Sequence, residues 1–163
     1  MSSIETRISR LEAAEEIRLL KAAYLSACDR KDPAAVRACF ADGQIHIDYG
    51  AVGSFDTADA LVKVYEQAAC HPHMVEMHHA ANPRIQVTGD DQATGQWALQ
   101  YQLINTRDRL LTQIGGEYED EYRKIDGAWK IVSTRFVVSS TLIVELGDVA
   151  MKVLVADRIA QIG

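Results

Sequence analysis

Tyr122-Arg-Lys-Ile-Asp-Gly-Ala-Trp-Lys-Ile131 carries the clearest structural signal in this 163-residue sequence. Its Asp126-Gly127 pair is typical of a two-residue hairpin turn, because both central residues of that turn need positive φ. Alternating residues on either side predict one strand over roughly residues 112–125 and an antiparallel partner over residues 129–139. The C-terminal half is therefore predicted to contain an antiparallel sheet.

A further strand is expected before this hairpin, after the turn-forming segment Gly89-Asp90-Asp91. Trp97, Leu99 and Tyr101 would share one face of it, and glutamines would occupy the other. If the glutamines faced inward, a pocket beside this strand would be polar; otherwise Trp97, Leu99 and Tyr101 would line it. Alternation alone leaves both possibilities open.

The preceding segment, His73-Met-Val-Glu-Met-His-His-Ala-Ala-Asn-Pro-Arg84, reads as a strand with two adjacent histidines. Successive side chains of a strand point to opposite faces, so Glu76 and His78 would share one face and His79 would lie on the other. Histidine is the side chain best suited to proton transfer near neutral pH. An inward-facing His78 is thus a candidate base, and a structural, hydrogen-bonded histidine is the alternative.

No metal site is predicted, although several histidines lie close together in the sequence. His71 and His73 belong to a loop, and the later histidines point to opposite faces of their strand. A zinc site needs three or four converging ligands. We therefore expect no metal ion.

The first half of the chain is predicted to be mainly helical. Apolar residues form one stripe from residue 4 to about Asp29, and Asp32-Pro33 then begins a second helix. Ile45–Tyr49 alternates as a strand, and Asp56-Thr57 begins a third helix. Helices followed by antiparallel strands predict an α+β fold, with a strongly curved antiparallel sheet, helices on its concave side, and a cone open to small molecules.

Composition limits the possible partners. The formal charge of −6 argues against nucleic acid or an anionic membrane surface as a partner, because both require a basic footprint. The chain begins without a signal-like segment and contains no 18-residue apolar run, so we expect a cytoplasmic protein with one domain over residues 1–163. Its three cysteines lack Cys-x-x-Cys spacing and are read as small buried residues.

The order of these segments resembles the SnoaL-like branch of the nuclear transport factor 2-like superfamily over roughly residues 10–138. The resemblance rests on Cys-Asp-Arg-Lys-Asp at 28–32, Ile-Asp-Tyr-Gly at 47–50, the His-x3-Asn-x-Arg spacing at 78–84, and the hairpin. It is strongest to the scytalone dehydratase and hexachlorocyclohexane dehydrochlorinase members. It implies the cone-shaped fold and chemistry without a cofactor.

In those members an aspartate orients a histidine base, and the matching positions are His78 and Asp29. Tyr49 matches a tyrosine that polarises the substrate carbonyl through a water. The resemblance therefore implies His78, Asp29 and Tyr49 as catalytic residues. We expect the substrate-binding residues to be Tyr24, Trp97, Tyr101, Tyr118 and Arg135.

Several positions depart from the family pattern or have structural explanations. Arg135 lies one position after the family's arginine, which would turn it to the other face of its strand unless a bulge intervenes. Asp29 could bind backbone groups at the helix end, while Tyr24 and Tyr49 could be core aromatics. The second histidine of the dehydratase falls on or near Leu103, and its serine and asparagine fall near Gly116 and Tyr118, so its substrate recognition is not reproduced.

The expected function is that of a cofactor-independent lyase or isomerase acting on a small cyclic or polyketide-like substrate, within a homo-oligomer of two or three chains. The alternative is a non-catalytic ligand-binding or assembly module, such as an accessory subunit of a ring-hydroxylating dioxygenase. The apolar tail, residues 139–163, would cover the pocket or an oligomer interface, or simply pack in the core.

Overall fold

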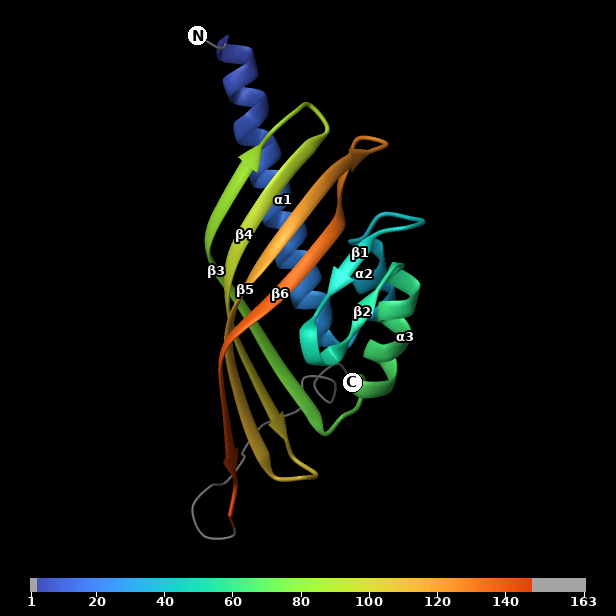
Figure 1. The fold of residues 1–163 in the computed structure, drawn as a ribbon, viewed down its shortest axis with the longest axis vertical. Coiled ribbons are helices and arrows are strands. Elements are labelled where there is room, and N and C mark those ends of the chain that lie inside the picture. Colours follow the sequence, from blue (N-terminus) through green and yellow to red (C-terminus); the bar gives the residue numbers. More distant parts are fainter. Residues whose placement is uncertain (1–2, 148–163) are drawn as a thin grey trace, which may run out of the picture.

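The computed structural model describes residues 3–147 and shows three α-helices packed on a six-stranded mixed sheet (Figure 1). The strand order is β2-β1-β6-β5-β4-β3. The elements are α1 (Ile4–Arg30), α2 (Pro33–Ala38), β1 (His46–Asp48), the 3-10 helix η1 (Gly50–Val52), β2 (Ser54–Phe55), α3 (Ala58–Ala68), β3 (Met74–Val87), β4 (Gln92–Asn105), β5 (Leu110–Ile125) and β6 (Ala128–Glu145). Within this range, no helix is both long and apolar enough to cross a membrane.

The sheet curves around α1, and its four long strands form a continuous antiparallel meander (Figure 1). Asp126 and Gly127 have φ of 51° and 82°, so the predicted two-residue turn between β5 and β6 is confirmed. Helix α1 lies along the concave face, and α2 and α3 lie beside its C-terminal half. This is the α+β cone that the sequence predicts.

The sheet differs from the antiparallel expectation at one edge. Strand β1 pairs in parallel with β6, because the chain enters β1 from α2 rather than through a hairpin. Strand β6 also continues to Glu145, six residues beyond the predicted end, and its last residues pair with the start of β5. Residues 139–145 of the predicted tail thus belong to the sheet, and residues 148–163 lie outside the described residues.

A bulge bends β3 in the middle of the histidine segment. The register with β4 shifts between Ala81 and Arg84, and Asn82 adopts a positive φ of 50°. Asparagine tolerates this left-handed conformation better than most residues, and bulges sharpen the twist of a strand. His78 and Glu76, which contact the last residues of α1, both lie in the half of β3 before this bulge.

The C-terminal end of α1 is fixed by local hydrogen bonds that aim its last residues at β3. Lys31 adopts the left-handed conformation at φ 58°, and its backbone N–H donates to the Ala27 and Cys28 carbonyl groups. The Asp32 carboxylate then accepts from the Ala35 N–H at 2.9 Å and caps α2. Asp29 and Lys31 therefore lie where a tightly turned chain leaves the helix.

Candidate active site

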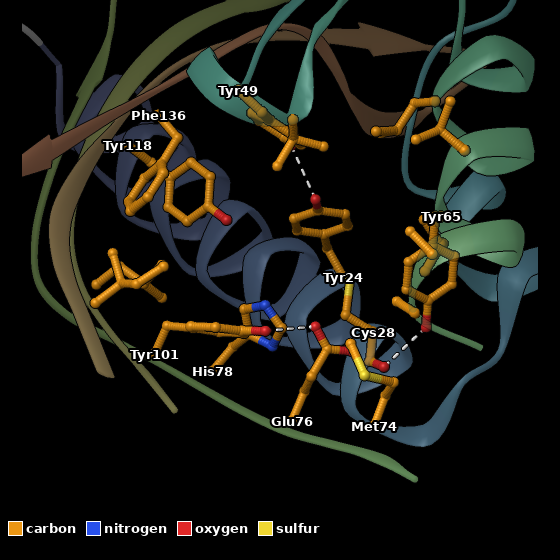
Figure 2. Close-up of a pocket in the computed structure, with 18 residues that line it drawn as sticks. Tyr24, Cys28, Tyr49, Tyr65, Met74, Glu76, His78, Tyr101, Tyr118 and Phe136 are labelled. Atoms are coloured by element: carbon orange, nitrogen blue, oxygen red, sulfur yellow. Dashed lines mark hydrogen bonds between the residues drawn. The ribbon is translucent and has the colours of Figure 1, made fainter. Parts of the chain in front are cut away.

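A cavity of about 310 Å³ lies between the C-terminal half of α1, helix α3 and the concave face of the sheet (Figure 2). Most of its wall is apolar, with Val36, Leu61, Leu99 and Phe136 among the lining residues. A mostly apolar wall with a few converging polar groups is the usual form of a small-molecule site.

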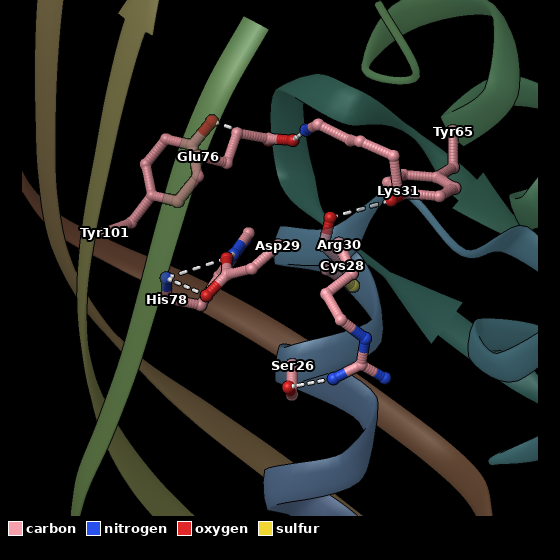
Figure 3. Close-up of polar contacts among 9 residues, drawn as sticks. All are labelled: Ser26, Cys28, Asp29, Arg30, Lys31, Tyr65, Glu76, His78 and Tyr101. Carbon is pink, nitrogen blue, oxygen red and sulfur yellow. Dashed lines mark hydrogen bonds and ion pairs between the residues drawn. The ribbon is translucent and has the colours of Figure 1, made fainter. Parts of the chain in front are cut away.

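His78 and Asp29 lie in contact at one side of this cavity, as the family resemblance implies. The His78 Nδ1–H donates to Asp29 Oδ1 at 2.8 Å, and the His78 backbone N–H donates to the same oxygen at 3.1 Å (Figure 3). Because an ionised carboxylate only accepts, this contact places the ring proton on Nδ1. Nε2 is then left as an acceptor, and no described residue forms a hydrogen bond to it.

Three further residues form a polar chain beside the His–Asp pair. The Lys31 ammonium forms an ion pair with the Glu76 carboxylate, and the Tyr101 hydroxyl donates to Glu76 Oε1 at 2.8 Å (Figure 3). The Tyr101 ring also packs against the His78 imidazole, with 4.7 Å between ring centroids. Burial lowers the pKa of the Lys31 ammonium. These hydrogen bonds and the ion pair link α1, β3 and β4 around the His78 imidazole.

Tyrosine hydroxyls provide the other polar groups of the cavity. The Tyr24 and Tyr49 hydroxyls are 2.8 Å apart and form one hydrogen bond, which leaves one of the two protons for a ligand (Figure 2). Burial raises the pKa of each of four phenols above the ordinary value for tyrosine: Tyr24, Tyr49, Tyr101 and Tyr118. These phenols therefore stay protonated and can donate hydrogen bonds at neutral pH.

The structure answers the question of which face of β4 points inward. Gln96 and Gln100 are exposed, whereas Leu99 and Tyr101 line the cavity. Trp97 shares their face but lies further along the strand, buried in the core, where its Nε1–H donates to the Tyr122 hydroxyl at 3.0 Å. The structure therefore places the predicted residue Trp97 outside the cavity.

Arg135 also lies away from the cavity. Its guanidinium is on the opposite side of the sheet, near the carboxylates of Asp48 and Glu119. The β-bulges of the β5–β6 pair fall at Gly115/Gly116 and Glu121/Tyr122, so they do not turn Arg135 back toward the cavity. Of the eight predicted site residues, the six that line or border the cavity are Asp29, His78, Tyr49, Tyr24, Tyr101 and Tyr118.

Sequence reasoning missed Lys31 and Tyr65, and it gave Glu76 no role. Glu76 could have been found, because it shares the face of His78 two residues earlier on the strand. Lys31 pairs with Glu76 from a left-handed backbone position at the end of α1, and no local sequence pattern predicts either feature. Tyr65 lines the cavity from α3, and its hydroxyl donates to the Cys28 carbonyl at 2.8 Å.

Within residues 3–147, no group of three or more His, Cys, Asp or Glu side chains could hold a metal ion. His71 and His73 stack on each other in the loop before β3, at 5.2 Å between ring centroids. His79 is exposed on the opposite face of β3 from His78. His71 and His73 thus lie in a loop, while strand alternation places His78 and His79 on opposite faces of β3.

This arrangement of curved sheet, packed helices and cavity is the nuclear transport factor 2-like fold. A model of the SnoaL-like domain matches residues 9–135. The chain belongs to the SnoaL-like domain family.

Three solved structures illustrate the similarity in fold. A protein from Novosphingobium aromaticivorans, provisionally described as a scytalone dehydratase, has a TM-score of 0.76 at 20% identity over 95% of this chain and 98% of its own. The type 3 hexachlorocyclohexane dehydrochlorinase of Novosphingobium barchaimii has a TM-score of 0.74 at 16% identity, covering 85% and 94%. A protein from Novosphingobium aromaticivorans, provisionally described as an aromatic ring hydroxylase, has a TM-score of 0.72 at 18% identity, covering 80% and 91%. At these identities the likeness concerns the fold.

Proposed function

We propose that this protein is a cofactor-independent lyase or isomerase that abstracts a proton from a small cyclic or polyketide-like substrate. The observation that carries the proposal is the 2.8 Å contact between His78 Nδ1 and Asp29 Oδ1 at the wall of a 310 Å³ cavity. A base needs an oriented acceptor within reach of its substrate, and this contact provides the orientation.

In this proposal His78 Nε2 takes the proton, and Asp29 stabilises the imidazolium that forms. Asp29 is held in turn by the His78 backbone N–H at 3.1 Å, so the carboxylate and the ring move together. The hydroxyl pair of Tyr24 and Tyr49 donates its free proton to the substrate oxygen on which negative charge develops. Proton abstraction and charge stabilisation then require no metal or cofactor.

The cavity also suggests the kind of substrate. Its volume of about 310 Å³ is at the lower end of the range for small-molecule sites, which suits a molecule of one or two rings. Aromatic and aliphatic side chains form most of the wall, so the ring system would be largely apolar. Its oxygen atoms would meet the tyrosine hydroxyls.

The experiment is a screen of dehydration and isomerisation substrates with matched histidine variants. His78→Ala should abolish turnover of any accepted substrate, whereas His79→Ala changes a neighbouring residue that faces away from the cavity and should retain it. Equal turnover by both variants would refute the base assignment. Ligand binding without turnover by the unmodified protein would favour the non-catalytic ligand-binding module.

We also propose that the chain forms homo-oligomers. The C-terminal half of β6 exposes a run of apolar side chains, with Val138, Leu142 and Ile143 each at least 50% exposed. Large exposed apolar patches usually mark interaction sites. Light scattering should give a mass of two or three chains, and a monomeric mass at micromolar concentration would contradict the proposal.

A further inference from the structure

Tyr118 presents its hydroxyl group to the cavity, and no described residue forms a hydrogen bond with that hydroxyl. The residue lies in the middle of β5, its side chain is buried, and its hydroxyl oxygen points into the cavity (Figure 2). The Tyr24 and Tyr49 hydroxyls, in contrast, bond to each other. Tyr118 is therefore the phenol of the cavity wall whose hydroxyl forms no hydrogen bond within residues 3–147.

A buried lysine lies against the face of the same ring. The Lys21 ammonium is 3.5 Å from the centroid of the Tyr118 ring, within the range of a cation–π contact. Lys21 is only 1% exposed, and its ammonium donates to Asp120 Oδ2 at 2.8 Å. A positive charge is thus held directly behind a phenol that faces the cavity.

The carboxylate that holds this charge is itself fixed. Asp120 accepts from the Tyr122 hydroxyl at 2.6 Å and from the Thr134 hydroxyl at 2.7 Å, in addition to the Lys21 ammonium. Burial lowers the pKa of the Lys21 ammonium, and the charge of Asp120 opposes that shift. Asp120 therefore serves both to position the ammonium and to retain its charge.

A buried ion pair of this kind is a weak source of stability, because desolvation of the two charges offsets much of their attraction. The Lys21–Asp120 pair can instead act on the cavity, because Lys21 lies against the ring of Tyr118. A cation on the face of an aromatic ring attracts π-electron density, which leaves the phenolic O–H more positive and makes it a better hydrogen-bond donor. A fixed donor of this type is worth most where oxyanion charge develops, in a site that excludes water.

We propose that Tyr118 is a hydrogen-bond donor to the carbonyl oxygen of the substrate, and that Lys21, held by Asp120, is a positioning residue that polarises this phenol. The inference deepens the proposed function and rests on it, since it adds a second donor to the substrate oxygen beside the Tyr24–Tyr49 hydroxyl pair. It implies a substrate with a carbonyl group. In a turnover assay, Tyr118→Phe should lower kcat about 10²- to 10³-fold, the usual effect of removing one such donor.

The test uses 1-tetralone labelled with ¹³C at its carbonyl, a bicyclic ketone of suitable size, and infrared spectroscopy of the bound probe. Binding to the unmodified protein should move the carbonyl band to lower wavenumber than in an apolar solvent. Tyr118→Phe should remove most of that shift and weaken binding about five-fold, the effect of one lost hydrogen bond. The double variant Lys21→Met/Asp120→Asn removes both charges but keeps an acceptor for Thr134. It should remove part of the shift that Tyr118→Phe removes.

Tyr122→Phe is the matched control, because it removes a hydrogen bond to Asp120 and leaves both Lys21 and Tyr118 in place. It should leave the band unchanged even if stability falls. A carbonyl band in Tyr118→Phe or in the double variant at the same wavenumber as in the unmodified protein would overturn the proposal. So would a Tyr122→Phe variant that moves the band as far as Tyr118→Phe does, or a failure of millimolar tetralone to bind. His78→Ala should not move the band, so loss of the base function and loss of the donor are distinguishable.

Discussion

Substitution of Asp29 by asparagine tests the His–Asp pair in the folded protein without any substrate. The Asp29 carboxylate accepts from the His78 ring at 2.8 Å and from the His78 backbone N–H at 3.1 Å. Both donors bond to the same oxygen, Oδ1, so the asparagine carbonyl could accept from both, but the negative charge that strengthens these two hydrogen bonds would be lost. A hydrogen bond to a charged group contributes about 1.5–3 kcal/mol, so we expect a loss of about 2 kcal/mol in the free energy of unfolding.

Urea denaturation followed by tryptophan fluorescence would measure this loss, and thermal unfolding should show the midpoint falling by about 4–8 °C for a chain of this length. The matched control is Asp32→Asn, because asparagine caps a helix as well as aspartate does and the Ala35 N–H keeps its acceptor. A loss in Asp29→Asn no larger than that of the control would refute the reasoning, since the carboxylate would then contribute nothing through His78.

Three further predictions concern the cavity wall and its support. Burial raises the pKa of all six tyrosines, so phenolate absorbance near 295 nm should not appear around pH 10 but together with unfolding. Above pH 10 the unfolded chain releases phenolic protons that the folded chain keeps, so the free energy of unfolding falls as the pH rises through this range. Gradual titration of the phenols while the protein stays folded would contradict this prediction. Gly116→Ala should cost about 1–3 kcal/mol in urea denaturation, because its Cβ would lie 2.5 Å from the Phe136 ring and 2.6 Å from a backbone oxygen, whereas Gly89→Ala, with no contact under 3.9 Å, should cost little. Burial raises the pKa of the Cys28 thiol to about 12, so iodoacetamide should label the part-exposed Cys70 first, and mass spectrometry showing Cys28 labelled first in the folded protein would contradict its burial.

Local signals account for most of the fold. The Asp126-Gly127 turn, the Asp32-Pro33 helix start and the strand alternation around His78 each depend on a few neighbouring residues, and each is found in the structure. The parallel pairing of β1 with β6 joins segments more than 80 residues apart, and no local pattern encodes it. The β6 extension was missed because residues 140–145 were read as the beginning of a tail.

The site was predictable only in part. Alternation placed Glu76 and His78 on one face, and the family resemblance supplied Asp29. Strand alternation gives the face of a residue but not its position along the cavity, which is why Trp97 was expected to bind substrate yet lies in the core.

The contacts of Lys21 and Lys31 escaped prediction for a different reason. Lys21 lies 99 residues from Asp120, and Lys31 lies 45 residues from Glu76. Charged residues on a helix usually point to solvent, so these two lysines gave no sign of burial in the sequence. Tertiary packing alone brings each of them to its carboxylate.

The position of the proton on the His78 ring tests the central claim most directly. Nitrogen-15 NMR of histidine-labelled protein at about pH 8, where an ordinary imidazole is neutral, distinguishes the two ring nitrogens, and His78→Ala assigns the signals. The account predicts a proton on Nδ1 and a bare Nε2 in the unmodified protein, with this preference reduced in Asp29→Asn. A proton on Nε2, or equal occupancy of both nitrogens, would contradict the assignment of His78 as an oriented base.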